Sequence, residues 1–390
     1  MPRFSQSPTE PAFVQDPYPA YDRMRAAGAL VLWDEYDLPC ATTHAGVHAL
    51  LRDRRFGREV PPEHATPTPE HCADFYAIEA HSMLELEPPN HTRLRGLVLR
   101  AFTSRRIKAL APEIEALCHR LIDDFPAGRF DLLDAYCRPV PVTVICRLLG
   151  VPEDMAPQLL RWSADMVAMY QARRDRAVED AANAAARDFA DFLRRYVEER
   201  RKAPAEDLIT ALITAEEDGA RLSNDELIAT CVLLLNAGHE ATVHSLGNGV
   251  KALLEHGVTP TAETAAAVTE EILRFDPPLH MFTRYAYEDV EVLGHRLARG
   301  DRVALLLGAA ARDPALRADP GVFDPACAVA NHVAFGGGMH FCVGAPLARL
   351  EMQVALPILF DRCAGLRLAA PPRYADLYHF HGLETLFVEA

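Results

Sequence analysis

The chain has 390 residues, 49% of them hydrophobic, and its 40 Lys and Arg against 55 Asp and Glu give a formal net charge of −15. This composition is typical of a globular chain, and the scattered Pro and Gly residues argue against collagen-like or low-complexity order. The negative charge disfavours an extended nucleic-acid or anionic-membrane surface. We therefore expect neither nucleic acid nor a membrane as a partner.

The first residues lack the cationic start and apolar core of a signal peptide, and no window reaches about 18 uninterrupted apolar residues. The nine cysteines are odd in number and contain no C-x-x-C pair, which fits neither a disulfide framework nor a zinc ribbon. These features predict a cytoplasmic protein, which we expect to be a monomer, with residues 1–15 loosely ordered.

Apolar residues recur at three- and four-residue spacing in four segments, which predicts helices over 107–125, 178–202, 223–256 and 264–275. Alternation over 283–293, interrupted by a turn at Glu288-Asp289, and the apolar run 303–307 predict strands. No Gly/Ser/Pro linker divides the chain. We therefore expect a mainly α protein with a minor β portion, folded as one domain over 1–390.

The segment 223–256 carries the most informative pattern. Ser223 and Glu226 form an S-x-x-E capping box, and the stretch 227–237 is apolar nearly all round, which implies burial. Gly238 and Glu240 then follow at mid-helix, where each costs stability. Such a cost suggests a functional site. The alternative is a close helix crossing at Gly238, with Glu240 paired to a neighbouring cation.

The strongest local signal is the segment 335–351, FGGGMHFCVGAPLARLE. Its glycines allow unusual dihedrals and close approach to a flat partner. Cys342 follows where the loop enters a helix, whose amide groups and dipole favour a thiolate. A nucleophilic cysteine, a zinc ligand and an axial ligand to haem iron compete as uses, with His340 as a partner for the first two. Neither of those two explains the glycines, and a buried structural thiol is the remaining alternative.

At this point the sequence resembles the cytochrome P450 family of haem-thiolate monooxygenases. Its cysteine loop, Phe-Gly-x-Gly-x-His-x-Cys-x-Gly, is matched over 335–344, and its bacterial continuation, Ala-Pro-Leu-Ala-Arg-Leu-Glu, over 345–351. The family's E-x-x-R helix is matched by Glu271 and Arg274, and its Pro-Pro-x-His-Thr-Arg-x-Arg signature by 88–95. The order of these blocks is also the family's.

The resemblance implies the cytochrome P450 fold around a buried haem b, with Cys342 as the axial iron ligand. A thiolate pushes electron density toward iron and favours O–O cleavage. Two buried propionates need charge-assisted partners, and the resemblance assigns these to His91, Arg95, Arg284 and His340. The further haem contacts that we expect are Phe335, Gly336, Gly344, Ala237 and Gly238.

Glu271 and Arg274 lie at i and i+3, so they can share one helix face, and the resemblance makes them a buried structural pair. The family's third partner for this pair is usually an arginine at the position of Cys327. Either another cation substitutes here, or the local bracing differs. A second departure is Pro357, which we expect to kink the following helix near Gln353.

A further departure concerns proton delivery. Family members commonly read Ala-Gly-x-Glu/Asp-Thr-Thr, whose acid and first threonine deliver protons to oxygen, whereas this chain reads AGHEAT over 237–242. Glu240 keeps the acid, but Ala241 replaces the first alcohol, and a methyl group cannot relay a proton. We expect water, Thr242 or a substrate hydroxyl to complete the relay.

The expected reaction inserts one oxygen atom of O2 into an apolar organic substrate. By position, the resemblance places Phe75, Met83, Leu233, Leu234, Leu279, His280, Met281, Phe282 and Leu386 along the substrate pocket, with His280 and Glu384 as polar anchors. A peroxide-driven hydroxylase and a non-catalytic haem sensor are the alternatives. The absence of Arg-Pro near Glu240 weakens the first, and the retained acid argues against the second.

Electrons are expected from a separate iron-sulfur ferredoxin and its NAD(P)H-dependent reductase. Residues 91–108 carry six Lys and Arg and no acid in an otherwise acidic protein. The part of this charge not assigned to haem could form a docking patch for an acidic ferredoxin, made by Arg93, Arg100, Arg105, Arg106 and Lys108. A solvated helix face is the alternative.

Overall fold

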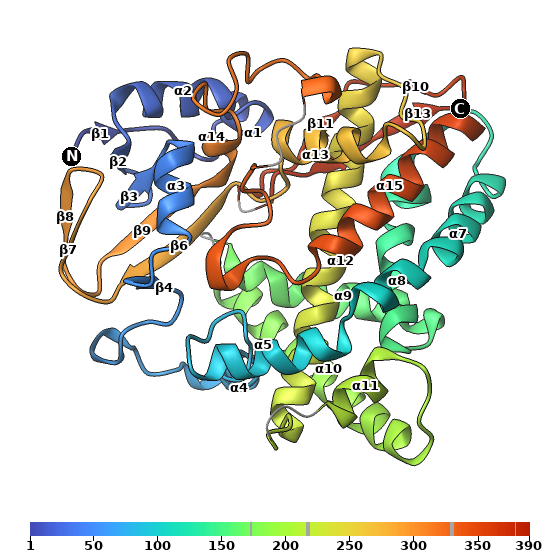
Figure 1. Cartoon of the computed structure of the whole chain (residues 1–390), viewed down its shortest axis with the longest axis horizontal. Helices are drawn as coiled ribbons and strands as arrows, with labels where there is room; N and C mark the ends of the chain where they lie inside the picture. Colours follow the sequence, from blue (N-terminus) through green and yellow to red (C-terminus); the bar gives the residue numbers. More distant parts are fainter. Residues whose placement is uncertain (172–173, 216–218, 328–330, 379) are drawn as a thin grey trace. The chain divides into compact units, whose positions relative to one another are not determined.

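The computed structural model describes residues 1–171, 174–215, 219–327, 331–378 and 380–390 (Figure 1). Its helices are α1 (Pro11–Gln15), α2 (Tyr18–Ala27), α3 (His44–Leu50), α4 (Ala73–Glu79), α5 (Asn90–Ala101), α6 (Ser104–Ala109), α7 (Ala111–Asp123), α8 (Pro139–Leu149), α9 (Ala156–Val167), α10 (Arg176–Lys202), α11 (Leu208–Thr214), α12 (Asn224–His256), α13 (Ala265–Phe275), α14 (Leu307–Ala311) and α15 (Ala345–Arg362). Its strands are β1 (Arg3–Phe4), β2 (Leu30–Trp33), β3 (Leu38–Ala41), β4 (Phe56–Gly57), β5 (Arg129–Asp131), β6 (Met281–Ala286), β7 (Val290–Val292), β8 (His295–Leu297), β9 (Arg302–Leu306), β10 (Arg367–Leu368), β11 (Arg373–Tyr374), β12 (Leu383–Thr385) and β13 (Phe387–Glu389). Helices thus dominate, as the sequence predicts.

The chain divides into two compact units. The first comprises Met1–His64, Glu113–Arg138 and Ala241–Ala390, and the second comprises Ala65–Pro112 and Pro139–Glu240. All the strands listed above belong to the first unit, and α12 contributes to both. The expectation of one domain around a haem stays a prediction.

The main sheet of the first unit has the strand order β1-β2-β3-β9-β6-β4. Its strand β9 shows why the run 303–307 is apolar throughout. Val303 and Leu305 belong to one buried core cluster, and Ala304 and Leu306 belong to another. Because successive strand residues point to opposite faces, a strand covered on both sides has no polar face. The predicted strand is confirmed.

The second unit is built around α10, which packs against α4 and α9. Its buried stripe recurs at helical spacing and includes Ala182, Ala186, Phe189, Leu193 and Val197. Trp162 of α9 stacks on Phe189 with 5.3 Å between ring centroids. The apolar face of the predicted amphipathic helix is therefore buried, as expected.

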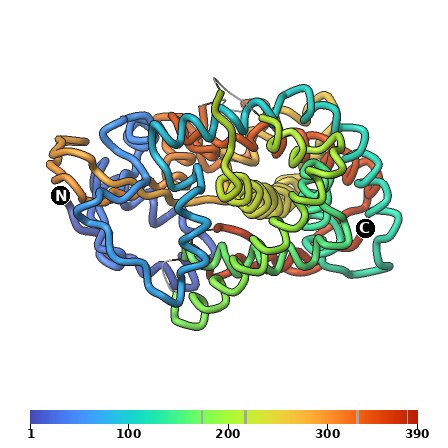
Figure 2. Tube along the Cα trace, turned by 90° about the horizontal axis from the view of Figure 1, so that it is seen from below, coloured from blue at the N-terminus to red at the C-terminus, as the bar shows by residue number. Residues whose placement is uncertain are grey.

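The helix α12 is 33 residues long, or about 50 Å, and Figure 2 shows it nearly end-on. Its predicted capping box is present. The Ser223 amide donates to Glu226 Oε2 at 2.8 Å, and the Glu226 amide donates to Ser223 Oγ at 3.2 Å. Helices predicted over 178–202, 223–256 and 264–275 are confirmed by α10, α12 and α13.

The helix predicted over 107–125 is wrong in one respect, because it consists of α6 and α7 with a break at Leu110. Pro112 has no amide hydrogen and cannot continue the ladder of α6, although it is tolerated in the first turn of α7.

The predicted turn at Glu288-Asp289 is present, but the two strands beside it do not pair with each other. β6 pairs with β9 and β4, and β7 pairs with β8.

The N-terminal segment is also better ordered than expected. β1 pairs in parallel with β2, and Phe13 of α1 is buried in a core cluster. The indole nitrogen of Trp33 donates to the Gln6 carbonyl oxygen at 2.8 Å. These contacts attach the segment to the first unit at Arg3–Phe4, Gln6 and Phe13. Across the described ranges, no helix combines the length and hydropathy needed to cross a bilayer.

Candidate functional site

The cysteine loop has a geometry that requires its glycines. Gly336 and Gly338 adopt φ values of +69° and +65°, and a Cβ atom on Gly338 would lie 2.2 Å from the Leu51 carbonyl oxygen. The Cys342 amide donates to the Phe335 carbonyl oxygen at 3.0 Å. Cys342 is exposed and precedes the first turn of α15, so the thiol lies at a helix N-terminus that favours its thiolate.

A salt-bridged cluster braces this loop on both sides. Glu270 of α13 accepts hydrogen bonds from Arg349 of α15 at 2.5 and 2.9 Å and lies 3.0 Å from His332 Nε2. The Arg349 guanidinium lies 4.6 Å from the centroid of the Phe335 ring. Burial raises the pKa of Glu270, but the hydrogen bonds and charges of Arg349 and His332 outweigh it and hold that pKa at about 2. The charged cluster thus ties the chain before and after Cys342 to α13.

The predicted pair of Glu271 and Arg274 is buried, with Nε–Oε2 and Nη2–Oε1 distances of 2.8 Å. Arg274 also donates to the carbonyl oxygens of Pro320 and Val322 at 2.8 and 3.1 Å. It therefore anchors the backbone that leads to the cysteine loop. This supports an architectural role.

The missing third partner of this pair is supplied by Arg317. Its Nη1 lies 2.9 Å from Glu271 Oε1, the oxygen that also accepts from the Asp324 amide at 2.8 Å. Cys327, where the resemblance led us to expect arginine, is exposed. Of the two alternatives, substitution by another cation is the one observed. No spacing rule points from Cys327 to a residue ten positions upstream.

Glu351 belongs to the matched motif but was given no role from the sequence. It lies fully buried in α15, and neither carboxyl oxygen has a hydrogen-bond partner among the described residues. Burial raises the pKa of this carboxyl well above its ordinary value. Burial therefore favours the protonated, neutral form of this carboxyl.

The helix α12 is mostly buried at its centre, except for a stripe that stays partly or fully accessible at Leu233, Asn236, Ala237, Glu240, Ala241 and His244. The spacing of three and four residues places these side chains on one helix face. Four of the predicted site residues, Leu233, Ala237, Glu240 and Ala241, therefore share one accessible face. Gly238 lies against α8, where an added Cβ would lie 3.0 Å from Ile145 Cγ1, so the close helix crossing considered above is also present.

Glu240 has a neighbour that the sequence analysis missed. Its side chain is 29% exposed, and Oε2 lies 3.3 Å from His239 Nε2. The other ring nitrogen of His239 lies 2.6 Å from the Leu235 carbonyl oxygen. His239 Nε2 is buried and has no hydrogen-bond partner among the described residues, so its approach to Glu240 is a close polar contact only.

The alcohol groups are arranged differently from the expected relay. Thr242 is buried, away from the accessible stripe. The Ser245 hydroxyl donates to the Ala241 carbonyl oxygen at 2.8 Å. Ser245 therefore has a hydroxyl group that is hydrogen-bonded to Ala241, the residue that replaces the usual threonine. The sequence signal was its place one helical turn after Ala241.

The four predicted propionate partners are basic residues with different degrees of burial. His91 and Arg95 lie on α5, with His91 buried, and Arg284 lies buried on β6, where its Nη1 donates to the Thr283 carbonyl oxygen at 2.9 Å. His340 is partly buried in the cysteine loop. Buried basic side chains suit carboxylates such as propionates, and a soft thiolate suits iron. The residues present therefore fit a haem.

The predicted substrate residues have different environments. Leu233, Leu279, Met281 and Phe282 are partly exposed, whereas the others are buried, namely Phe75, Met83, Leu234, His280 and Leu386. Met281 packs on the core cluster that contains Trp33, whereas Phe282 packs on the other cluster. Leu279 packs on the same cluster as Phe282, so the three partly exposed residues of this segment all contact the core.

His280 does not lie where a substrate anchor would. It is fully buried, and its Nδ1 lies 2.9 Å from the Tyr21 hydroxyl oxygen. The residue directly follows Leu279, which is partly exposed, so the expectation erred by treating the whole run 279–282 as one surface. Glu384, the other expected anchor, is exposed.

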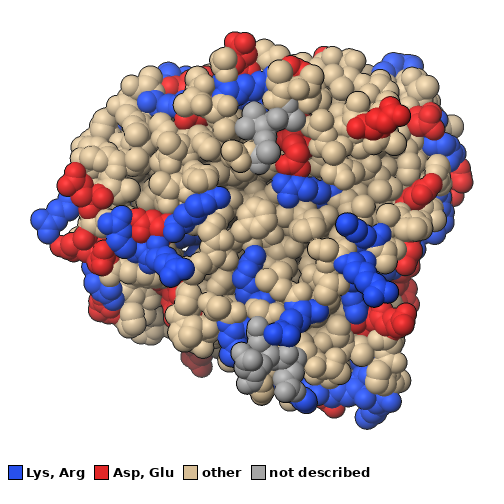
Figure 3. Space-filling view, in the orientation of Figure 1, with Lys and Arg blue, Asp and Glu red and all other residues tan. Residues whose placement is uncertain are grey.

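The predicted docking patch needs one correction. Arg93 forms an ion pair with Glu226 of α12, so its charge is partly neutralised within the protein. Arg100, Arg105 and Lys108 are exposed, and Arg106 is partly so. Figure 3 shows several Lys and Arg side chains in the region where Figure 1 places α5.

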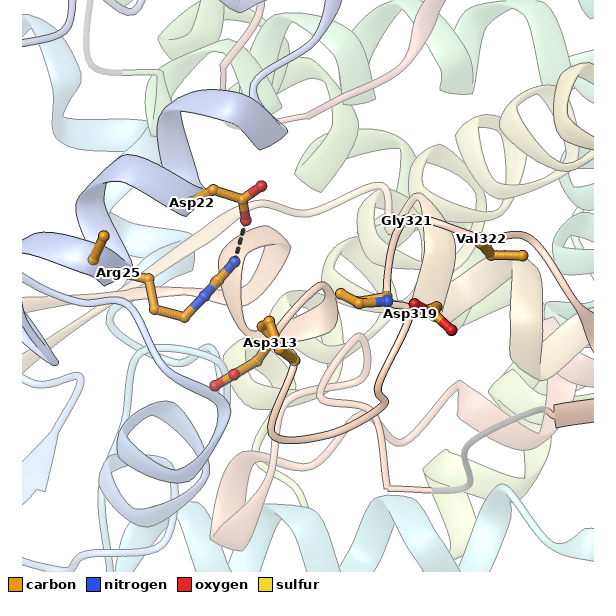
Figure 4. Close-up of a pocket in the computed structure, with 9 residues that line it drawn as sticks. Asp22, Arg25, Asp313, Asp319, Gly321 and Val322 are labelled. Atoms are coloured by element: carbon orange, nitrogen blue, oxygen red, sulfur yellow. Dashed lines mark hydrogen bonds and ion pairs between the residues drawn. The ribbon is translucent and has the colours of Figure 1, made fainter.

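A surface pocket of about 680 Å³ lies elsewhere in the first unit, between α2 and the segment 313–322 (Figure 4). Asp22 and Arg25 form an ion pair at its edge, and Arg25 also donates to the Ala309 carbonyl oxygen at 2.8 Å. None of the predicted site residues lines it. We assign the pocket no part in the chemistry.

Comparison with known proteins supports the same family. The family model described as Cytochrome P450 matches residues 65–258 and 263–365. The chain is 38% identical to the cytochrome P450 monooxygenase PikC of Streptomyces venezuelae, over 92% of this chain and 87% of that protein. It is 39% identical to the 6-deoxyerythronolide B hydroxylase of Saccharopolyspora erythraea, over 77% of this chain and 74% of that protein.

Among solved structures, the chain is similar to P450BioI in complex with an acyl carrier protein ligated to hexadec-9Z-enoic acid. The TM-score is 0.91 at 32% sequence identity, covering 97% of this chain and 99% of that one. The chain belongs to the cytochrome P450 family and has its mainly α fold. It is a haem-thiolate oxidoreductase of the monooxygenase class, as its named relatives are.

Proposed function

We propose that this cytochrome P450 inserts one oxygen atom of O2 into an apolar organic substrate, with Cys342 as the axial ligand of a haem b. The observation that carries the proposal is the exposed Cys342 thiol, held at the N-terminus of α15 by a loop in which Gly336 and Gly338 have positive φ and a Cβ on Gly338 would collide with the Leu51 carbonyl oxygen. The charged cluster around Glu270 fixes this geometry. Such a rigid thiolate is what axial ligation needs.

The residues that would hold the haem are Cys342 on one side, the propionate partners His91, Arg95, Arg284 and His340, and the contacts Phe335, Gly336, Gly344, Ala237 and Gly238. Bound haem supplies the activation of dioxygen. The chain's own residues position the group, exclude water and move protons.

Proton delivery is assigned to the accessible stripe of α12. Glu240, partly exposed and beside His239, takes a proton from solvent and passes it along this face. In most family members a threonine relays the proton to oxygen. Here water, a substrate hydroxyl or Ser245 takes this role, and the Ser245 hydroxyl donates a hydrogen bond to the Ala241 carbonyl oxygen. Thr242 and Ser245 are both buried, and Ser245 is preferred only because its hydroxyl donates to the Ala241 carbonyl oxygen.

The substrate is expected to be mostly apolar, because Leu233, Leu279 and Phe282 are apolar and partly exposed. The relatives include a hydroxylase of 6-deoxyerythronolide B and the polyketide biosynthesis cytochrome P450 PksS of Bacillus subtilis. Polyketide-derived lactones are therefore the first substrate class to test, with fatty acyl chains second. Electrons come from a ferredoxin and its NAD(P)H-dependent reductase, docking at Arg100, Arg105, Arg106 and Lys108.

The proposal is tested by titrating ferric protein with a panel of lactones and fatty acids, since displacement of water from iron changes its spectrum. Compounds that bind are then incubated with ferredoxin, reductase and NAD(P)H, or with peroxide alone. Product that requires the electron-transfer proteins supports the proposal. Product with peroxide alone would establish the peroxide-driven alternative, and binding without product under either condition would indicate a sensor.

A further inference from the structure

Three side chains that the proposed function does not use meet in the interior of the first unit. Asp276 follows α13, His280 precedes β6, and His381 lies just before β12. They are 5%, 0% and 7% exposed. One potential ligand atom from each lies within 4.8 Å of those from the other two. Two imidazoles and a carboxylate at this separation are a common donor set for transition metals.

The two histidine rings pack on each other, with ring centroids 4.4 Å apart. Tyr21 lies 2.9 Å from His280 Nδ1, whereas His280 Nε2 is buried and has no hydrogen-bond partner among the described residues. His381 stacks on Tyr374, with ring centroids 3.9 Å apart, and its Nε2 lies 3.4 Å from Asp276 Oδ1. A buried nitrogen without a partner costs free energy, and a metal ion would accept its lone pair.

The surroundings hold the carboxylate of this cluster in place. Tyr18 donates to Asp276 Oδ1 at 2.7 Å, and Tyr374 donates to Oδ2, which orients the carboxylate as outer-shell partners commonly do.

We propose that Asp276, His280 and His381 bind one transition-metal ion of the Zn²⁺ class. In a tetrahedral zinc site with bonds of about 2.0–2.1 Å, the ligand atoms are roughly 3.4 Å apart, so closure of the site needs only small side-chain shifts. The site contributes one negative charge from Asp276 and two neutral nitrogens.

Nearby cations decide which metal fits. The Arg312 guanidinium lies 3.9 Å from the centroid of the Tyr18 ring, and the Lys251 ammonium lies 5.5 Å from that of Tyr374. These charges oppose a hard cation held only by electrostatics, such as Mg²⁺ or Ca²⁺. They are better tolerated by Zn²⁺, Ni²⁺ or Cu²⁺, which bind imidazole strongly.

The bound ion would cross-link two segments of the first unit. His280 lies beside Leu279, which bridges to Phe380 next to His381. These segments continue into Phe282 and Leu386, both expected along the substrate pocket. The ion would therefore fix the wall of that pocket, which goes beyond the proposed oxidation chemistry.

The test uses the haem-loaded protein, stripped with a chelator, dialysed against ZnCl₂ and analysed for zinc and iron together. Iron counts the folded, haem-bound molecules. We expect about one zinc per haem iron, loss of that zinc in His280→Gln/His381→Gln, and a melting temperature that rises by about 2 °C or more with zinc in the wild type only. Asp276→Asn serves as a second variant if the double variant does not retain haem.

The matched control is His71→Gln, in a partly exposed cluster of His71, Cys72 and Glu179 that could also hold a metal. This variant should keep the zinc bound at the buried site. Zinc absent from the wild-type protein, or lost with His71→Gln and retained in both buried-site variants, would overturn the proposal.

Discussion

Arg317 Nη1 lies 2.9 Å from Oε1 of Glu271, a carboxylate with no exposed surface. Glu271 therefore has two guanidinium partners, because Arg274 also forms an ion pair with it. The contact joins α13 to the segment before the cysteine loop. It replaces the arginine that the family usually places at the position of Cys327.

The first prediction concerns this contact. Arg317→Ala leaves part of the buried Glu271 charge without a partner and should lower the free energy of unfolding by about 2 kcal/mol. Haem should also be lost at a lower urea concentration. Arg296→Ala is the control, since its ion pair with Asp289 is on the surface, with Arg296 77% exposed, and should be worth under about 1 kcal/mol.

Introducing Cys327→Arg into the Arg317→Ala variant should restore most of the lost stability, because it returns a cation to the family's usual position. An Arg317→Ala protein as stable as the wild type would contradict the assigned role. So would the absence of any rescue in the double variant when both proteins still bind haem.

The second prediction concerns acid stability. The pKa of Glu270 is depressed to about 2 in the folded protein, against an ordinary value of 4.5. Its stabilisation is therefore present above about pH 4.5 and is lost as pH falls toward 2. Glu270→Gln should lower stability at pH 7 by at most about 3 kcal/mol and flatten the pH dependence between pH 4.5 and 2. Urea unfolding at several pH values measures both effects.

The third prediction has the opposite sign. The pKa of Glu351 is raised by burial, so the folded protein holds this proton more tightly than the unfolded chain does. The stability it contributes is present below about pH 4.5 and is lost as pH rises through the folded pKa. Glu351→Leu should therefore be more stable than the wild type at pH 8, by about 1 kcal/mol, with little difference at pH 4. A variant equally destabilised at both pH values would contradict this account.

Sequence reasoning found the parts of the molecule whose signals are local. The capping box of Ser223, the i and i+3 spacing of Glu271 and Arg274, and the glycines before Cys342 each act within a few residues. Arg317 and Glu270 could not be found in this way, because their partners lie 46 and 79 residues away. Their pairing depends on tertiary packing. His280 was assigned to the wrong environment because a run of apolar neighbours does not reveal which face each side chain takes.

The fourth prediction concerns proton delivery. In our account water, the substrate or Ser245 relays the proton that a threonine at position 241 would otherwise relay. Ala241→Thr should therefore lower the fraction of NAD(P)H use that yields product. Glu240→Gln should lower kcat by about 100-fold, the lower range for losing a proton-transfer group. Product and NAD(P)H are quantified together. A rise of coupling in Ala241→Thr would show instead that the natural site is impaired or that the assay substrate is wrong.

The fifth prediction concerns the redox partner. Charge reversal at Arg100 and Arg105, on α5 and α6, should raise the KM for ferredoxin by about tenfold and weaken the salt dependence of turnover. Arg187→Glu, on an exposed part of α10, should change neither. Turnover that is independent of ionic strength, or unaffected by both reversals, would place the docking surface elsewhere.

The central claim is that Cys342 binds the haem iron as a thiolate. The most direct test is the absorption spectrum of the reduced, carbon monoxide-bound protein. We predict the red-shifted Soret band of thiolate ligation in the wild type and its loss in Cys342→Ser. A freshly prepared, natively folded wild-type protein without that band would contradict the assignment.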